Sequence, residues 1–387
     1  MIERVPKTAV QAGILVGAKF LAKLISFFAF IFVVRKIGPE HFGVYTYLVS
    51  LAMIVLPFAS LGMGGNLIRL VKKKGEDLVD GAFLTYLASA LVFVGGTVIL
   101  VLYKGYSGVL AFATGAYLLV RAFYDLGELN QYIKGRVRFV TIASVGERLL
   151  FTVLVFLLPA KTSSLFIASV GSLGVLSIYL FLTGKVRPKF EFNLKYYSLA
   201  FFSGSFFLAL GERLPSLIYE SRFGIVALGI FGAALTLHQA GMFVFMESYK
   251  FLLVRLGFMK EDAEEKYKKI LLLIAGFLLV AVLVGRPLLV WAGNLIYGAS
   301  YVNVGQVFAN LMLAAPALVL MFYPRSKLVY DSPRVYLVCV GVYAVGMVLM
   351  SLIVRDIVEA SLGYALVAFL GFFVWWGVLK KGLGKPQ

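Results

Sequence analysis

The feature that most constrains this chain is a nearly unbroken series of long apolar segments. Between charged or turn-forming residues, the 387-residue sequence contains twelve of them. Each is close to the ~20 residues that a helix needs to cross the hydrocarbon core of a bilayer. They lie near 10–34, 43–68, 82–103, 108–128, 139–159, 163–183, 196–220, 225–249, 269–290, 302–323, 334–354 and 357–379. The sequence therefore predicts an all-α integral membrane protein with twelve transmembrane helices and no soluble domain between them.

Composition excludes several classes of protein. Hydrophobic residues make up 61% of the chain and charged residues 14%, whereas soluble domains have roughly 45–50% and about 25%. Cys339 is the single cysteine, and His41 and His238 are the only histidines. An intrachain disulfide, a thiolate metal site and a multi-histidine metal centre are thus excluded. We expect no metal and no cofactor, and no Ser-His-Asp order or nucleotide-binding motif indicates an enzyme.

The formal charge of +18 is explained by membrane topology. Lysine and arginine collect in the cytoplasmic loops of membrane proteins. With both termini in the cytoplasm, the twelve segments place 25 of these residues inside and 7 outside, and 5 remain within the segments. We therefore predict a multi-pass protein of the cell membrane with both termini cytoplasmic, and we do not expect nucleic acid as a partner.

One short motif occurs twice, at the turns that follow the first and the seventh segments. The first copy starts at Lys36 and the second at Arg222, and both have the pattern basic-x-Gly-x4-Gly-aliphatic-aromatic. Their glycines, Gly38 and Gly224, are separated by 186 residues. Glycine suits a helix–helix corner because it accepts positive φ and close packing. Two six-helix halves would place equivalent corners at these two positions, as parallel repeats do in transporters.

These corners also resemble a known family. The run from Arg35 to Tyr45, which contains Gly-Pro-Glu-His-Phe-Gly, is similar to the turn after the first helix of Wzx-type polysaccharide flippases. The run Leu228–Ala234 is similar to a second hallmark of that family, which follows its seventh helix. Here Phe231 stands in place of the usual tyrosine, and Glu220 in place of the expected aspartate.

The resemblance implies the fold and function of the MOP superfamily, which also contains MATE drug exporters and lipid II flippases. We expect two pseudo-symmetric six-helix lobes around a central cavity, at 1–185 and 196–387, with a cytoplasmic linker at 186–195. The resemblance further implies alternating access and a polyprenyl-(pyro)phosphate-linked oligosaccharide as substrate. Membrane lipid and the glycosyltransferases or polymerase of the same pathway would be its partners.

Ionisable residues inside the segments are the candidate functional residues, since each costs roughly 2.5–3.5 kcal/mol to insert if it faces lipid. Lys19 and Lys23 are four residues apart and share one helix face. They either face an anion-binding cavity or pair with Asp125 or Glu147 on other helices. The candidates for binding an anionic head group are Lys19, Lys23, Arg121, Arg148 and Arg213. The candidates for coupling transport to H+ or Na+, or for charge pairing, are Asp125, Glu147, Glu212 and His238.

Pairing within this set follows from helix geometry. Arg121 and Asp125 are spaced to form an i,i+4 ion pair. Glu147 and Arg148 point about 100° apart on a helix, so at least one should need a partner on another helix. At the segment ends, Tyr323, Trp375 and Trp376 are expected in the aromatic belt of the membrane interface.

Two further functions stay open at this point. A MATE-like, cation-coupled exporter of small molecules would have acidic residues facing a cationic drug, whereas the first segment here carries lysines. An integral-membrane glycosyltransferase or polymerase would need catalytic acids in an outer loop. The outer acids are Glu40, Glu220, Asp356 and Glu359, and no long outer loop accompanies them.

Overall fold

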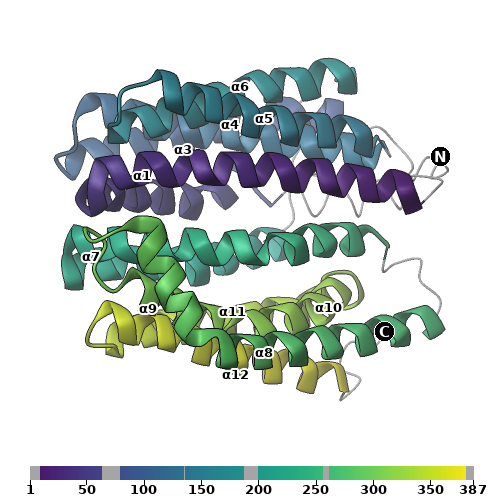
Figure 1. Ribbon diagram of the computed structural model, residues 1–387. Helices are drawn as coiled ribbons and strands as arrows, with labels where there is room; N and C mark the ends of the chain where they lie inside the picture. Colours follow the sequence, from purple (N-terminus) through teal and green to yellow (C-terminus); the bar gives the residue numbers. More distant parts are fainter. Residues whose placement is uncertain (1–8, 63–78, 135, 187–198, 256–260, 381–387) are drawn as a thin grey trace. The chain divides into compact units, whose positions relative to one another are not determined.

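The structure is a computed structural model that describes residues 9–62, 79–134, 136–186, 199–255 and 261–380 (Figure 1). The described part of the chain is helical throughout, with short turns and no strand. Its eleven helices are α1 (Ala9–Ser60), α3 (Val79–Tyr103), α4 (Gly108–Ile133), α5 (Val137–Leu157), α6 (Thr162–Gly184), α7 (Leu199–Arg255), α8 (Glu261–Tyr297), α9 (Val304–Met312), α10 (Ala315–Asp331), α11 (Pro333–Ile353) and α12 (Ile357–Lys380). The predicted all-α class is confirmed.

Nine of the described helices are long and apolar enough to cross a membrane, or ten if the bent pair α9–α10 forms one span. The exposed side chains support this assignment. On α8 they form a continuous stripe at helical spacing, made of Leu273, Phe277, Val280, Val284, Leu288, Trp291 and Leu295. So large an exposed apolar surface is rare on soluble monomers. The chain is a multi-pass membrane protein.

The two longest helices each consist of two helical segments that meet at a glycine. In α1 the break is Gly38, with φ 78° and ψ 169°. In α7 it is Gly224, with φ 84° and ψ 168°. Both conformations are nearly closed to residues with a side chain. The two corners predicted to be equivalent thus have the same backbone geometry at the same motif position.

The described chain divides into two compact units. The first comprises Met1–Ile37 and Leu48–Phe206, and the second comprises Gly38–Tyr47 and Phe207–Gln387. In the first unit α4 packs against α3, α5 and α6, and α5 also packs against α6. The last segment of α1 packs on α3 and α4 through a small cluster of buried residues, namely Ala52, Ala59, Ala90 and Leu118.

The second unit repeats this neighbour pattern. Here α10 packs against α8, α11 and α12, and α11 also packs against α12. The last segment of α7 packs on α8 and α10 through Met242, Leu271 and Val319. Each helix of this set therefore corresponds to one of the first unit: α8 to α3, α10 to α4, α11 to α5 and α12 to α6.

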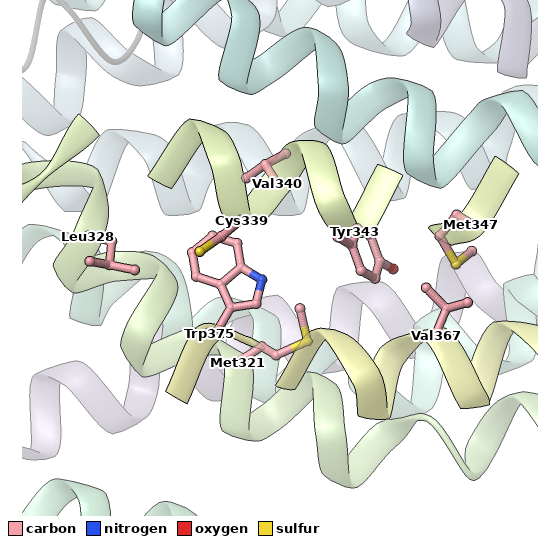
Figure 2. Close-up of a cluster of buried hydrophobic side chains, with 8 residues drawn as sticks. All are labelled: Met321, Leu328, Cys339, Val340, Tyr343, Met347, Val367 and Trp375. Atoms are coloured by element: carbon pink, nitrogen blue, oxygen red, sulfur yellow. The ribbon is translucent and has the colours of Figure 1, made fainter. Parts of the chain in front are cut away.

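A cluster of eight buried side chains from α10, α11 and α12 forms part of the core of the second unit (Figure 2). Trp375 lies at its centre and is 1% exposed. Tyr323, in a neighbouring cluster, is buried to the same extent. The assignment of Tyr323 and Trp375 to an interfacial belt is therefore wrong. Both rings point into the helix bundle and pack in its core. Trp376 donates from Nε1 to the Leu320 carbonyl at 3.1 Å.

Several predicted segment ends differ from the helices. The tenth segment, 302–323, is divided into α9 and α10, which are bent by 41°. The predicted cytoplasmic loop 324–333 is mostly helix, since α10 runs to Asp331 and α11 starts at Pro333. The charged residues 261–266, between the eighth and the ninth predicted segments, are likewise the first turns of α8. In the last two regions polar residues extend a helix beyond the apolar stretch. The linker 187–195 lies outside the described residues.

Candidate functional site

The two lysines of α1 lie on the side of the helix opposite its exposed apolar face. Four exposed apolar residues of this segment, Leu21, Ile25, Phe28 and Phe32, recur every three or four positions and form one stripe, and Phe20, which is 37% exposed, lies to one side of it. At about 100° per residue, Lys19 and Lys23 lie roughly 160–200° around the axis from Leu21. Both side chains are half-buried. The lysines are therefore directed away from the face that this segment exposes to lipid.

Ring contacts fix the register between this segment and α5. Phe30 lies 6.2 Å from Phe151, and Phe32 lies 5.5 Å from Phe156, between ring centroids. Both residue numbers rise together, so the two helices run parallel. The two contacts are offset by 121 and 124 residues, so Lys23 stands level with residues 144–147 of α5.

The charged turn of α5 contains an ion pair between adjacent residues. Arg148 Nε lies 2.9 Å from Glu147 Oε2, with Glu147 nearly buried and Arg148 more exposed. The two residues therefore pair with each other, which the directions of their Cα–Cβ bonds did not suggest. Although the Cα–Cβ bonds point about 100° apart, the long guanidinium stem of Arg148 reaches back to the carboxylate.

Helix α4 contributes the second ion pair of this unit. Arg121 Nη2 lies 2.9 Å from Asp125 Oδ1, as the i,i+4 spacing predicts, and both side chains are about one-third exposed. Arg121 also lies over the ring of Tyr124, 5.8 Å from its centroid. Tyr124 is hydrogen-bonded to Ser144 of α5 and lies within electrostatic range of Glu147. The ion pairs of α4 and α5 thus belong to one polar group.

Sequence reasoning did not identify the tyrosines of this group. Besides Tyr124, Tyr86 of α3 interacts with both Arg121 and Asp125 and donates its hydroxyl to the Ala122 carbonyl at 2.9 Å. With 21 tyrosines in the chain, nothing in the sequence distinguishes these two. In the first unit Arg121 and Arg148 therefore pair with the carboxylates of Asp125 and Glu147, with Glu128 one turn farther along α4, and Lys19 and Lys23 belong to the same unit.

Removing the acid of the α4 pair should have a measurable effect on stability. We expect Asp125→Asn to lower the free energy of unfolding by about 1 kcal/mol, because Arg121 loses a partly screened ion pair. The matched control is Glu265→Gln, which removes the i,i+4 partner of Lys269 at 3.4 Å, where both side chains are about 70% exposed. Thermal unfolding in detergent should show a lower midpoint for Asp125→Asn only, and equal midpoints would contradict this assignment.

The predicted residues of the second unit gather around two further tyrosines. Tyr343 of α11 and Tyr364 of α12 are hydrogen-bonded through their hydroxyl groups, and Glu212 lies within electrostatic range of both. Arg213 also interacts with Tyr364. The ring of His238 stands edge-on to that of Tyr364, at 6.1 Å between centroids. Tyr343 is one of the eight side chains of the apolar cluster that Figure 2 shows.

His238 is the most enclosed ionisable residue of this second group. It is 3% exposed, and its Nδ1 atom makes no hydrogen bond to the part of the chain that the structure describes. Such groups are uncommon in folded proteins. The arrangement provides a carboxylate, an imidazole and two hydroxyls, which are groups able to bind or pass a proton or a small cation. Among the described residues, no three His, Cys, Asp or Glu side chains are placed to hold a metal ion together.

Solved structures with the same fold belong to membrane transporters. No protein-family model matches the sequence, and no curated protein is similar to it at the sequence level. The lipid II flippase MurJ in an inward closed conformation superposes with a TM-score of 0.75 and 11% identity, over 95% of this chain and 87% of that one. An inward-facing multidrug resistance MATE transporter of the MOP superfamily gives 0.65 and 14%, over 94% and 95%.

A third similar structure is a MOP superfamily transporter from Pyrococcus furiosus, described by the reverse polarity of its binding pocket. It has a TM-score of 0.63 and 15% identity, over 98% of this chain and 96% of that one. At these identities the likeness establishes the fold. The chain has the fold of the MOP superfamily transporters.

Proposed function

We propose that this protein moves a polyprenyl-(pyro)phosphate-linked oligosaccharide from the cytoplasmic to the outer leaflet of the cell membrane by alternating access. The observation that carries the proposal is the position of Lys19 and Lys23. Both lie on the face of α1 opposite its exposed apolar stripe. Two lysines on one face that is turned away from lipid offer positive charge to the anionic head group of such a substrate. The MOP fold supports a transport role, without a catalysed reaction.

We propose that the chain crosses the membrane twelve times, in two six-helix lobes around a central cavity. The apolar parts of α1 and α7 are 44 and 42 residues long. At ~1.5 Å per residue each would measure about 65 Å, twice the ~30 Å of the hydrocarbon core. The breaks at Gly38 and Gly224 divide each into two crossings. The repeated neighbour pattern of the two units supports lobes at 1–185 and 196–387, joined by the linker 186–195.

The proposed topology places both termini in the cytoplasm and can be tested by labelling. In a Cys339→Ala background, we expect a cysteine at Ser332, between α10 and α11, to be protected from a membrane-impermeant maleimide in intact cells. A cysteine at Lys104, between α3 and α4, should react under the same conditions, because it lies on the outer side. Labelling of Ser332→Cys from outside would overturn the topology.

The charged groups have complementary roles in this proposal. Lys19 and Lys23 attract the phosphate groups, and Arg121, Arg148 and Arg213 extend the positive surface along its path. Outward movement of a negative charge is favoured by the inside-negative potential, by roughly 2.3 kcal/mol per charge per 100 mV. Asp125, Glu147, Glu212 and His238 are proposed to couple transport to H+ or Na+. The proposed partners are membrane lipid and the glycosyltransferases or polymerase of the same pathway.

Binding measurements test the proposed substrate class. Native mass spectrometry of the detergent-purified protein should show retention of a polyprenyl-diphosphate-linked oligosaccharide. A polyprenol of the same chain length without the phosphates should be lost at lower collision energy, because it offers nothing to the cations. Equal retention of the two lipids would show that the cations do not recognise the head group.

A MATE-like exporter of small cations is the second candidate, and the group around Glu212, His238 and Tyr364 favours it. A carboxylate in that group could attract a cationic molecule. Cells that express the protein would then gain resistance to lipophilic cations such as ethidium, and Glu212→Gln would remove the resistance. We expect no gain in resistance, since Lys19 and Lys23 disfavour cations.

A further inference from the structure

Arg286 is the only charged residue of α8 after Lys269, and it lies on the inner face of that helix. Ala275 and Val282, each 3% exposed, mark this face, and Arg286 follows them at helical spacing. Val284, which is 78% exposed, lies about 160° around the helix axis from Arg286. Because a guanidinium keeps its charge in proteins, this face of α8 directs a cation into the second unit.

Hydrogen bonds tie Arg286 to two other helices of the second unit, in which α9 packs against both α8 and α12 (Figure 1). Arg286 Nη2 donates to Asn310 Oδ1 on α9 at 2.7 Å. Asn310 Nδ2 donates to the Ser361 hydroxyl at 3.0 Å and to the Val358 carbonyl at 3.3 Å, both on α12. Since a carbonyl only accepts and a guanidinium only donates, the amide has a single orientation. Asn310 and Ser361 are also fully buried, so they hold Arg286 in a fixed position.

The charge of Arg286 has no acidic partner within the part of the chain that the structure describes. The acids near the start of α12 are bound to backbone groups. Asp356 accepts from two N–H groups of the first turn of α12, and Glu359 accepts from the Arg355 N–H. Asn310 is neutral. Buried charges are normally paired, so an anion from outside the chain would complete this group.

Arg286 also keeps donors for such an anion. A guanidinium has five N–H groups, and the bond to Asn310 is the one hydrogen bond that the described residues give it. The side chain is half-buried, and none of its nitrogens is a buried atom without a partner. The remaining N–H groups are therefore accessible. A fixed guanidinium with free donors is suited to bind two oxygens of one phosphate group.

The depth of Arg286 along α8 matches that of lipid head groups. It comes 17 residues after Lys269, about 25 Å at ~1.5 Å per residue, whereas the hydrocarbon core is ~30 Å thick. Through Asn310 it is level with Ser361, in the first turns of α12, and α12 starts at Ile357 directly after the turn from α11. Two helices thus place Arg286 at one end of the unit, near the membrane surface.

We infer that Arg286 binds the phosphate group of a membrane lipid and that Asn310 and Ser361 position it. Basic pockets between membrane helices bind lipid head groups in this way. The outer leaflet is the source of the lipid, a point that rests on the topology in the proposed function. The site is separate from Lys19 and Lys23, which belong to the first unit.

Lipid retention by the purified protein tests this site. Native mass spectrometry would compare phosphatidylglycerol with a diacylglycerol that has the same acyl chains and no phosphate. We expect Arg286→Gln to retain one phosphatidylglycerol fewer than the wild type, with binding at that site weakened roughly 10- to 100-fold by the lost charge-assisted hydrogen bond. Retention of diacylglycerol should not change. Arg286→Lys keeps the charge without the planar fork, so its retention should lie between those of the wild type and Arg286→Gln.

Two further variants separate binding from folding. Arg355→Gln removes an exposed arginine at the same end of the unit and should retain phosphatidylglycerol as the wild type does. Asn310→Asp keeps the site testable if Arg286→Gln does not fold, because a carboxylate of the same shape would neutralise Arg286 in place and keep it hydrogen-bonded. Its retention of phosphatidylglycerol should also fall. Wild-type retention by Asn310→Asp, or an equal loss in Arg355→Gln, would overturn the site.

An excess of inorganic phosphate distinguishes a lipid from a free ion. We expect the bound lipid to stay, because its acyl chains add to the binding, whereas release of the lipid would assign the site to the free ion and overturn this inference. These measurements involve no transport. A protein that binds phosphatidylglycerol through Arg286 and flips no lipid-linked oligosaccharide would contradict the proposed function alone, and loss of the site would leave that function standing.

Discussion

Replacing Lys19 and Lys23 together by glutamine should abolish flipping and leave a folded, inserted protein. The two side chains are half-buried on the face of α1 that is turned away from its exposed apolar stripe. A charge-assisted hydrogen bond contributes about 1.5–3 kcal/mol, so the loss of two should weaken head-group binding by roughly 10²- to 10⁴-fold. Insertion should not suffer, because a charged lysine costs about 2.5–3.5 kcal/mol at the centre of a membrane helix and glutamine carries no charge.

Two comparisons separate a binding role from a structural one. Lys19→Arg with Lys23→Arg should retain part of the activity, since arginine keeps the charge but changes its geometry. Lys104→Gln with Lys161→Gln removes two exposed lysines outside the helices and should leave flipping unchanged. The assignment is wrong if the double glutamine variant flips lipid at the wild-type rate, or if it fails to fold while the arginine variant folds.

Truncating Trp375 should cause the largest loss of stability of any single substitution considered. The side chain is 1% exposed and is packed by Met321, Leu328 and Tyr343 (Figure 2). Trp→Ala substitutions in packed cores cost about 3–5 kcal/mol, a large part of the ~5–15 kcal/mol that stabilises a typical domain. We expect Trp375→Ala to lower the unfolding midpoint strongly and to reduce the yield of folded protein from membranes.

The control for this substitution is another tryptophan. Trp291, in the exposed stripe of α8, is 60% exposed, so Trp291→Ala should leave no cavity and should shift the midpoint only slightly. Trp375→Phe keeps much of the side-chain volume, so its shift of the unfolding midpoint should lie between those of Trp375→Ala and Trp291→Ala. Equal shifts for Trp375→Ala and Trp291→Ala would mean that Trp375 faces lipid, as its place near a segment end suggested.

Much of the fold follows from the sequence because its strongest signals are physical constraints of the bilayer. The length of each apolar segment and the 186-residue spacing of Gly38 and Gly224 were sufficient to expect equivalent helix corners. The α9–α10 break is not visible in hydrophobicity, since residues 302–323 form one apolar run, but Pro316 in the first turn of α10 is a sequence signal for it, because proline disfavours a continuous helix. Helix ends at polar residues such as Asp331 were missed because hydrophobicity does not mark where a helix stops.

The candidate site could be predicted only in part. The Arg121–Asp125 pair follows from i,i+4 spacing, which is local. The Glu147–Arg148 pair was missed because side-chain reach exceeded what Cα–Cβ directions indicate. The hydrogen bond between Tyr343 and Tyr364 joins two helices, and a single sequence carries no signal that two such residues meet.

The most direct test of the account is a flipping measurement with the purified protein. Proteoliposomes would carry a fluorescent polyprenyl-diphosphate-linked oligosaccharide, and the fraction in each leaflet would be read by a membrane-impermeant quencher. The account predicts that the wild-type protein moves the lipid between leaflets, that an inside-negative potential speeds its outward movement, and that Lys19→Gln with Lys23→Gln stops it. Flipping no faster than in protein-free liposomes, with and without a potential or an H+ or Na+ gradient, would contradict the proposed function.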